Sequence, residues 1–277
     1  MTVILGLAAA ASWGGGDFGG GLASRRVPVY GVVLISQVTG FVGSFGLALA
    51  RGEALPTGTD LLICAIAGAL GAFGITMLYR GLAIGRMGIV APVTGVLAAV
   101  IPVIAGFVIE GVPQPMVLLG IVVAVMAVVL VSRVADETGG RAGLVEALAG
   151  GTAIGLFGVA IAYLSEGDVF ADLAVIRLVQ GVLVATAVLV MHAAWRPGGS
   201  WLLPLVLIGI LDTAGNAFYL AAVQTGQLAI ASVLSAMYPV MTVILAAVVL
   251  REPVTRDHTI GVGLAGAAIV LIGAGGA

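Results

Sequence analysis

Residues 213–250 read TAGNAFYLAAVQTGQLAIASVLSAMYPVMTVILAAVVL and contain no Asp, Glu, Lys or Arg. As one helix this stretch would be about 57 Å long, far more than the ~30 Å of hydrocarbon that a membrane helix crosses. The chain must therefore turn within it, and the polar residues 224–227 are the predicted turning point. We expect one span over 197–223 and another over 228–250.

The composition of the whole chain agrees with this interpretation. The 277 residues are 61% hydrophobic and only 9% charged, whereas soluble proteins carry roughly 25% charged residues. An integral membrane protein is therefore indicated. The other apolar runs predict eight further spans, at 1–23, 27–50, 61–79, 87–109, 111–132, 147–165, 178–195 and 259–277.

The two halves of the sequence resemble each other. Residues 74–91 align with 214–231 at an offset of 140, and residues 120–131 align with 261–272 at an offset of 141. A repeat at a nearly fixed offset indicates duplicated structure. Five spans per half is an odd number, so the second half enters the membrane from the opposite side. Inverted repeats of this kind are typical of secondary transporters, whose sites lie near the midplane between the repeats.

We therefore expect an all-α, polytopic membrane protein with ten transmembrane helices in two inverted five-helix repeats around a central cavity. The first repeat is predicted over 1–135 and the second over 142–277, joined by a short linker at 136–141.

Short motifs occur in matching order along both halves. They are Ser12-Trp13-Gly14, Tyr79 with Ala83, Val90-Ala91-Pro92-Val93, Glu110, Tyr219 with Ala221 and Ala222, Tyr238-Pro239 and Arg251-Glu252. In these motifs the whole chain resembles the drug/metabolite transporter superfamily, and it is identified as a member of the ten-helix EamA type. The resemblance implies the same inverted-repeat architecture and the export of small metabolites, amino acids prominent among them. Where the family often has Asn, this chain has Asp17.

Two acidic residues stand out by their position. Most acidic residues lie in predicted loops or at span ends, and only Asp17 and Asp212 fall well inside apolar segments. A charge at the bilayer centre costs roughly 3 kcal/mol on insertion scales, so it normally faces a cavity or a partner. We expect Asp17 and Asp212 to bind a substrate ammonium group or to accept a proton. The alternative is a structural role at a broken helix or an interface.

Further residues near these acids are candidates for an apolar cavity with a few polar points. The predicted substrate-binding residues are Trp13, Asp17, Phe73, Met77, Tyr79, Phe157, Asp212, Asn216, Tyr219, Ser235 and Tyr238. Pro92, Pro102 and Pro239 are hinge candidates because proline interrupts helical hydrogen bonding. The glycines at 14–16 and 19–21 favour close packing of the first helix. For each of these residues the alternative is plain packing against helices or lipid.

These features predict a secondary active exporter of small metabolites, with amino acids the favoured substrates, working by alternating access in the inner (plasma) membrane. One alternative is efflux of cationic drugs, using Asp17 with cation–π attraction to Trp13. Antiport of sugar phosphates or nucleotide sugars is less favoured. The sequence has no lysine, and Arg177 is the arginine most able to hold phosphate inside a span. A passive channel is a further alternative.

The sequence also predicts several absences. No nucleophile with a nearby base and no metal-ligand spacing occurs in the spans, so no enzyme activity, cofactor or metal is expected. The sequence has no basic patch, so no nucleic-acid partner is expected. The expected partners are a small-molecule substrate, the lipid bilayer and a proton as candidate coupling ion, and the chain is expected to be a monomer or homodimer.

The orientation in the membrane stays open. Nine of the eleven arginines lie in odd-numbered loops, which the positive-inside rule would place in the cytoplasm. The family resemblance instead favours cytoplasmic termini.

Overall fold

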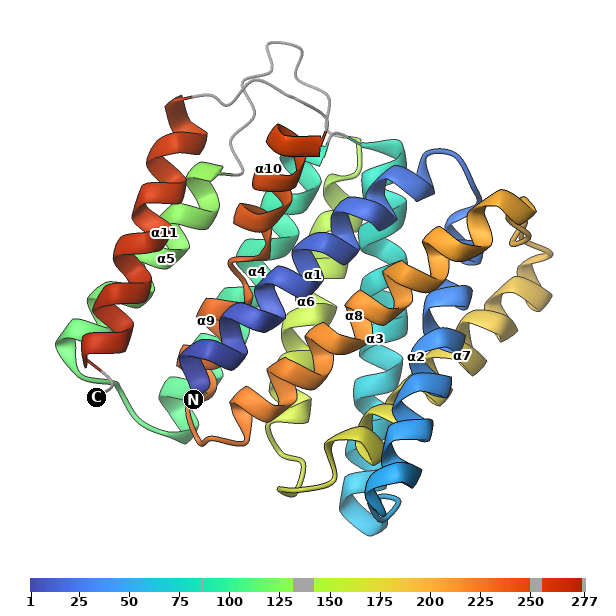
Figure 1. The fold of residues 1–277 in the computed structure, drawn as a ribbon, viewed down its shortest axis with the longest axis horizontal. Coiled ribbons are helices and arrows are strands. Elements are labelled where there is room, and N and C mark those ends of the chain that lie inside the picture. The colour runs from blue at the N-terminus through green and yellow to red at the C-terminus, as the bar shows by residue number, and fades with distance from the viewer. Residues whose placement is uncertain (86, 132–141, 250–255, 276–277) are drawn as a thin grey trace.

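The computed structural model describes residues 1–85, 87–131, 142–249 and 256–275, and these form a bundle of helices (Figure 1). In chain order the helices are α1 (Thr2–Ser24), α2 (Val29–Arg51), α3 (Gly58–Ile84), α4 (Met87–Ile109), α5 (Pro115–Val131), α6 (Leu144–Ile161), α7 (Val169–Met191), the 3-10 helix η1 (Gly199–Trp201), α8 (Leu202–Val223), α9 (Leu228–Ser235), α10 (Tyr238–Val249) and α11 (Arg256–Gly275). The predicted all-α fold is confirmed. The predicted linker at 136–141 lies outside the described residues.

The long charge-free stretch turns where the sequence predicted. Helix α8 ends at Val223 and α9 begins at Leu228, so residues 224–227 form the connection. Helix α7 differs more from its predicted span, because it begins at Val169 and so takes in Asp172 and Arg177. Both side chains are buried inside the protein, where partners replace the water that a charge would otherwise need.

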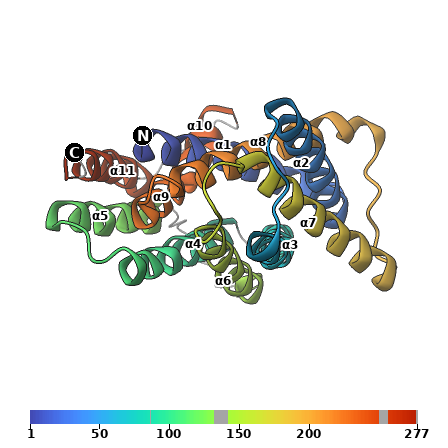
Figure 2. The ribbon, with the colours of Figure 1, turned by 90° about the horizontal axis from the view of Figure 1, so that it is seen from below.

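The helices form two layers, which are visible from below in Figure 2. One layer contains α11, the α9–α10 pair, α1, α8 and α2. The other contains α5, α4, α6, α3 and α7. Each layer therefore mixes helices from both halves of the chain.

The packing of the helices repeats when the two halves are exchanged. The contact between α1 and α8 has its counterpart between α6 and α3, and the contact of α1 with α9 and α10 has its counterpart between α6 and α4. Helices α2 and α7 pack on each other, as do α5 and α11. In Figure 1, α1 runs upward from the N-terminus whereas α6 runs downward, so the repeats are inverted.

The ninth span is broken, whereas the fourth is not. Helix α9 ends at Ser235 and α10 begins at Tyr238, and the Met237 N–H bonds the Leu234 carbonyl in a tightened turn. Pro239 follows at once, and it has no N–H to continue the helical ladder. Helix α4 runs unbroken from Met87 to Ile109 through both Pro92 and Pro102. Of the three hinge candidates, Pro239 alone adjoins a break.

Five of the described segments are long and apolar enough to cross a membrane on their own: α2, α3, α6, α7 and η1 with α8. Helix α1, which contains Asp17 and the glycines at 14–16 and 19–21, is not among them.

The loop acid Glu53 ties α2 to the beginning of α7. Its Oε2 accepts hydrogen bonds from the backbone N–H groups of Phe170 at 2.8 Å and Ala171 at 2.9 Å. Its Oε1 accepts a hydrogen bond from the Arg51 Nε at 2.8 Å, and the Glu53 side chain is only 6% exposed. The first N–H groups of a helix have no partner within the helix, so this carboxylate serves as their cap.

We therefore expect Glu53→Ala to lower the free energy of unfolding by about 0.5 to 2 kcal/mol, the range for loss of a helix cap. Glu53→Gln keeps an acceptor oxygen and should lose less. Unfolding in detergent, followed by circular dichroism, measures both variants. Wild-type stability of Glu53→Ala would show that the cap contributes nothing.

Candidate functional site

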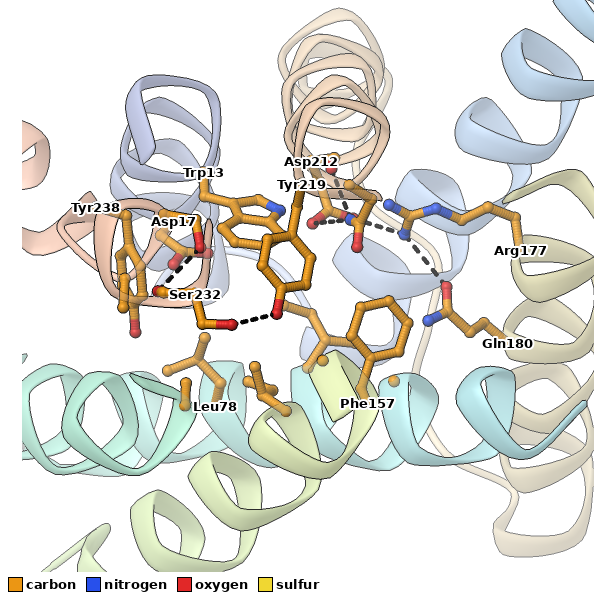
Figure 3. Close-up of a pocket in the computed structure, with 18 of the residues that line it drawn as sticks. Trp13, Asp17, Leu78, Phe157, Arg177, Gln180, Asp212, Tyr219, Ser232 and Tyr238 are labelled. Atoms are coloured by element: carbon orange, nitrogen blue, oxygen red, sulfur yellow. Dashed lines mark hydrogen bonds and ion pairs between the residues drawn. The ribbon is translucent and has the colours of Figure 1, made fainter. Parts of the chain in front are cut away.

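A cavity lies between the two layers, beside the break between α9 and α10 (Figure 3). It has a volume of about 90 Å³, well below the ~300–1,000 Å³ of sites for drug-sized ligands. Its lining residues are Trp13, Asp17, Gln37, Gly71, Ile75, Leu78, Ala98, Ile154, Phe157, Gly158, Arg177, Gln180, Asp212, Asn216, Tyr219, Ser232, Ser235, Ala236 and Tyr238. They come from both repeats, and the few polar groups stand among apolar side chains.

Glycines bring α1 close to its neighbours around the cavity. A Cβ added at Gly14 would lie 2.7 Å from the carbonyl oxygen of Tyr238 in α10. One added at Gly16 would lie 3.5 Å from the backbone nitrogen of Asp212 in α8. The approach at Gly14 is too close for any side chain, whereas the added Cβ at Gly16 would make an ordinary van der Waals contact. The glycines around Asp17 therefore set its helix directly against α8 and α10.

Asp17 lies at one end of the cavity. It is half-buried, and no described residue makes a hydrogen bond or an ion pair with its carboxylate. Trp13 lies one helical turn earlier, with its ring centroid 5.5 Å from that of Tyr219. The Tyr219 hydroxyl in turn forms a hydrogen bond with the Ser232 hydroxyl at 2.7 Å. The wall beside the Asp17 carboxylate is thus aromatic and fixed in place.

Arg177 lies at the opposite end, on α7 (Figure 3). Its Nη1 donates to Asp212 Oδ2 at 2.6 Å, to Gln37 Oε1 at 2.7 Å and to Gln180 Oε1 at 3.2 Å. The side chain of Arg177 is 3% exposed and that of Asp212 is 12% exposed. Asp212 is therefore one half of a buried ion pair.

The amide side chains complete this polar end of the cavity. The Asn216 Nδ2 donates to the backbone carbonyl of Asp212 at 2.8 Å, one helical turn earlier. Gly71 of α3 leaves room for the Gln180 amide, since a Cβ there would overlap its Nε2. Among the described residues, no group of three or more His, Cys, Asp or Glu could hold a metal ion.

The structure brings eight of the eleven predicted substrate-binding residues to the cavity. They are Trp13, Asp17, Phe157, Asp212, Asn216, Tyr219, Ser235 and Tyr238.

The other three predicted residues, all on α3, lie elsewhere. Phe73 is 51% exposed on the outer surface, Met77 packs against Gly150 of α6, and the buried Tyr79 directs its hydroxyl at Gly20 of α1. The cause is helical rotation. Successive side chains are about 100° apart, so the cavity-lining series on α3, which begins at Gly71, leaves Phe73 and Met77 on other faces.

Four polar residues of the cavity are not among the predicted substrate-binding residues: Gln37, Arg177, Gln180 and Ser232. Of these, only Arg177 was considered from the sequence as a ligand-binding group, for phosphate. A signal existed for three of them. Gln37 and Gln180 are amides inside apolar runs, and Arg177 directly precedes such a run. An arginine within a membrane helix is rare and generally faces the bundle interior.

Comparison with known proteins agrees with this architecture. One solved structure, described only as the crystal structure of a protein, superposes with a TM-score of 0.77 over 98% of this chain and 95% of that chain, at 19% sequence identity. At that identity the likeness concerns the fold alone. A search of curated proteins finds no significant match. The EamA-like transporter family matches residues 1–133 and 141–274, once for each half. The chain belongs to the EamA-like transporter family, as a multi-pass membrane protein with two inverted repeats around a central cavity.

Proposed function

We propose that this transporter exports small zwitterionic metabolites, above all amino acids, across the inner (plasma) membrane. The observation that carries the proposal is the Asp17 carboxylate, which lines the cavity between the repeats with no hydrogen-bond or ion-pair partner among the described residues. A carboxylate so placed attracts a cation, and a substrate ammonium group supplies one.

A proton is the candidate coupling ion at the same position. Asp17 cannot satisfy an ammonium group and a proton at once, so the two compete for one carboxylate. Proton entry from one side of the membrane then favours release of the substrate on that side. Alternating access between the inverted repeats opens the cavity first to one side of the membrane and then to the other.

The size and charge of the cavity argue against the other transport functions. A volume of about 90 Å³ suits a small metabolite better than a drug-sized cation. The ion pair with Asp212 offsets the charge of Arg177. The cavity therefore lacks the excess positive charge that a phosphate dianion requires.

We expect Asp17→Asn to reduce amino-acid counterflow in proteoliposomes by about tenfold or more, because the amide cannot pair with an ammonium group. The assay uses radiolabelled amino acids of several sizes. Glu166→Gln is the matched control, since it makes the same chemical change at an exposed loop position and should transport like wild type.

Three outcomes would contradict the proposal. Equal transport by wild type and Asp17→Asn would remove Asp17 from the mechanism. Equilibration without counterflow would indicate a channel. Failure of folded wild-type protein to transport any amino acid, with transport of a cationic drug, would favour drug efflux.

A further inference from the structure

The Arg177 end of the cavity has more hydrogen-bond donors than the described residues use. Arg177 makes all its hydrogen bonds through Nη1, while its Nε and Nη2 have no partner among the described residues. The Nε2 of Gln37 is likewise without a described partner. Both residues line the cavity and are at most 2% exposed.

These unused donors form a recognisable pattern. Nε and Nη2 lie along one edge of the planar guanidinium group, and two parallel N–H bonds from such an edge match the two oxygens of a carboxylate. Buried donors in folded proteins are nearly always paired, so an unpaired set beside a cavity indicates a bound water, ion or ligand. Gly40 of α2 leaves room beside this edge, because a Cβ there would lie 3.1 Å from the Arg177 Nε.

We propose that the free edge of Arg177, together with the Gln37 amide nitrogen, is the subsite that receives the carboxylate of the transported metabolite. This inference rests on the proposed function and gives its substrate a second point of attachment. Asp212 and Gln180 are positioning residues, since they hold Nη1 and leave Nε and Nη2 to the ligand. The cavity then has two poles, with Asp17 for the ammonium group and Arg177 for the carboxylate.

The charge balance of the cavity supports this assignment. Ionised Asp17 and Asp212 contribute two negative charges and Arg177 one positive charge. A zwitterion leaves that sum unchanged while placing each of its charges beside an opposite one. A simple amine would gain the Asp17 contact but leave the donors of Arg177 unpaired, and a site with unpaired polar groups rejects such an analogue strongly.

The test compares leucine with isopentylamine, which has the same side chain and ammonium group but no carboxylate. Trp13 lines the cavity and reports binding by its fluorescence once the other two tryptophans, Trp195 and Trp201, are replaced by phenylalanine. In this background the variant Arg177→Gln/Asp212→Asn removes the ion pair without leaving either charge alone. The matched control is Arg80→Gln/Glu146→Gln. It removes an ion pair outside the cavity, in which Arg80 Nε and Glu146 Oε1 are 3.5 Å apart.

We expect the Arg177→Gln/Asp212→Asn variant to weaken leucine binding by about 10- to 100-fold, the effect of losing a charge-assisted contact. Isopentylamine binding should change much less, so that the preference for leucine over the amine collapses. The control variant should keep the wild-type preference. Equal weakening of both ligands, or no change in the preference, would overturn the assignment.

A third ligand, isovalerate, separates this inference from the proposed function. Isovalerate carries the carboxylate without the ammonium group. If wild type transports no amino acid but binds isovalerate in an Arg177-dependent manner, the carboxylate subsite stands while the amino-acid proposal falls. If amino acids are transported but isovalerate binding ignores the Arg177 substitution, the subsite falls alone. Chloride that occupies the site and blocks both leucine and isovalerate would identify an inorganic-anion site and overturn the substrate role.

Discussion

Replacing Arg177 alone by glutamine is expected to lower the free energy of unfolding by about 3 to 5 kcal/mol. The substitution leaves the Asp212 carboxylate without the guanidinium group that now lies 2.6 Å away. A carboxylate stranded in a membrane protein interior loses its hydration and gains no partner in return. The three acceptors that share Nη1 lose their donor together.

The double variant Arg177→Gln/Asp212→Asn is the control for this prediction. Because both charges are removed, the desolvation of an unpaired ion no longer applies, and most of the lost stability should return. Unfolding of detergent-solubilised protein by increasing SDS, followed by circular dichroism, measures all three proteins. A single variant as stable as wild type, or a double variant as unstable as the single, would contradict the account of Arg177 and Asp212 as a buried pair.

Adding one methyl group at Gly14 is the second change with a large expected effect. In Gly14→Ala the new Cβ would lie 2.6 Å from the Met241 Cβ and 2.7 Å from the Tyr238 carbonyl oxygen. The oxygen belongs to the backbone and cannot turn aside, so α1 and α10 must separate. Overpacking of this kind costs about 1 to 3 kcal/mol, and separation here would also displace the neighbouring break before α10.

The same substitution at Gly43 should instead raise the free energy of unfolding. Gly43 lies on α2 with nothing within 4 Å of an added Cβ, and alanine is favoured over glycine in a helix by about 1 kcal/mol. Gly14→Ala and Gly43→Ala can be compared by the same unfolding assay and by transport. If Gly14→Ala proved neutral or stabilising, the contact between α1 and α10 would not be as close as the structure has it.

The architecture could be predicted from sequence because it depends on the length, charge content and number of the apolar runs, which can be read directly from the chain. The length and charge content of each apolar run fix where a helix can cross the bilayer. The number of runs per half fixes the inversion. The bounds of α4, at Met87 and Ile109, and the turn at 224–227 followed directly. Helix α7 extended beyond its run because two charged residues in it are buried against partners.

The site was predictable only in part. A charged side chain inside a membrane span normally faces a cavity or a partner, so the position of Asp17 in the chain made it a candidate for the cavity. The faces of α3 could not be assigned, because its residues are apolar all round and lipid favours the same residue types as the interior. Phe73 was therefore expected inside and lies outside.

The sequence by itself determined that the chain is a membrane protein of two inverted repeats, with an acid, Asp17, inside an apolar span. Tertiary structure alone decided which charges meet. Arg177 and Asp212 are on different helices, and they pair at 2.6 Å only because α7 and α8 are rotated to face the same cavity. The break before α10 was decided in the same way, because Pro102 and Pro239 occupy corresponding spans and only one of them adjoins a break. Helix rotation depends on packing against neighbours, and no local property of an all-apolar segment encodes it.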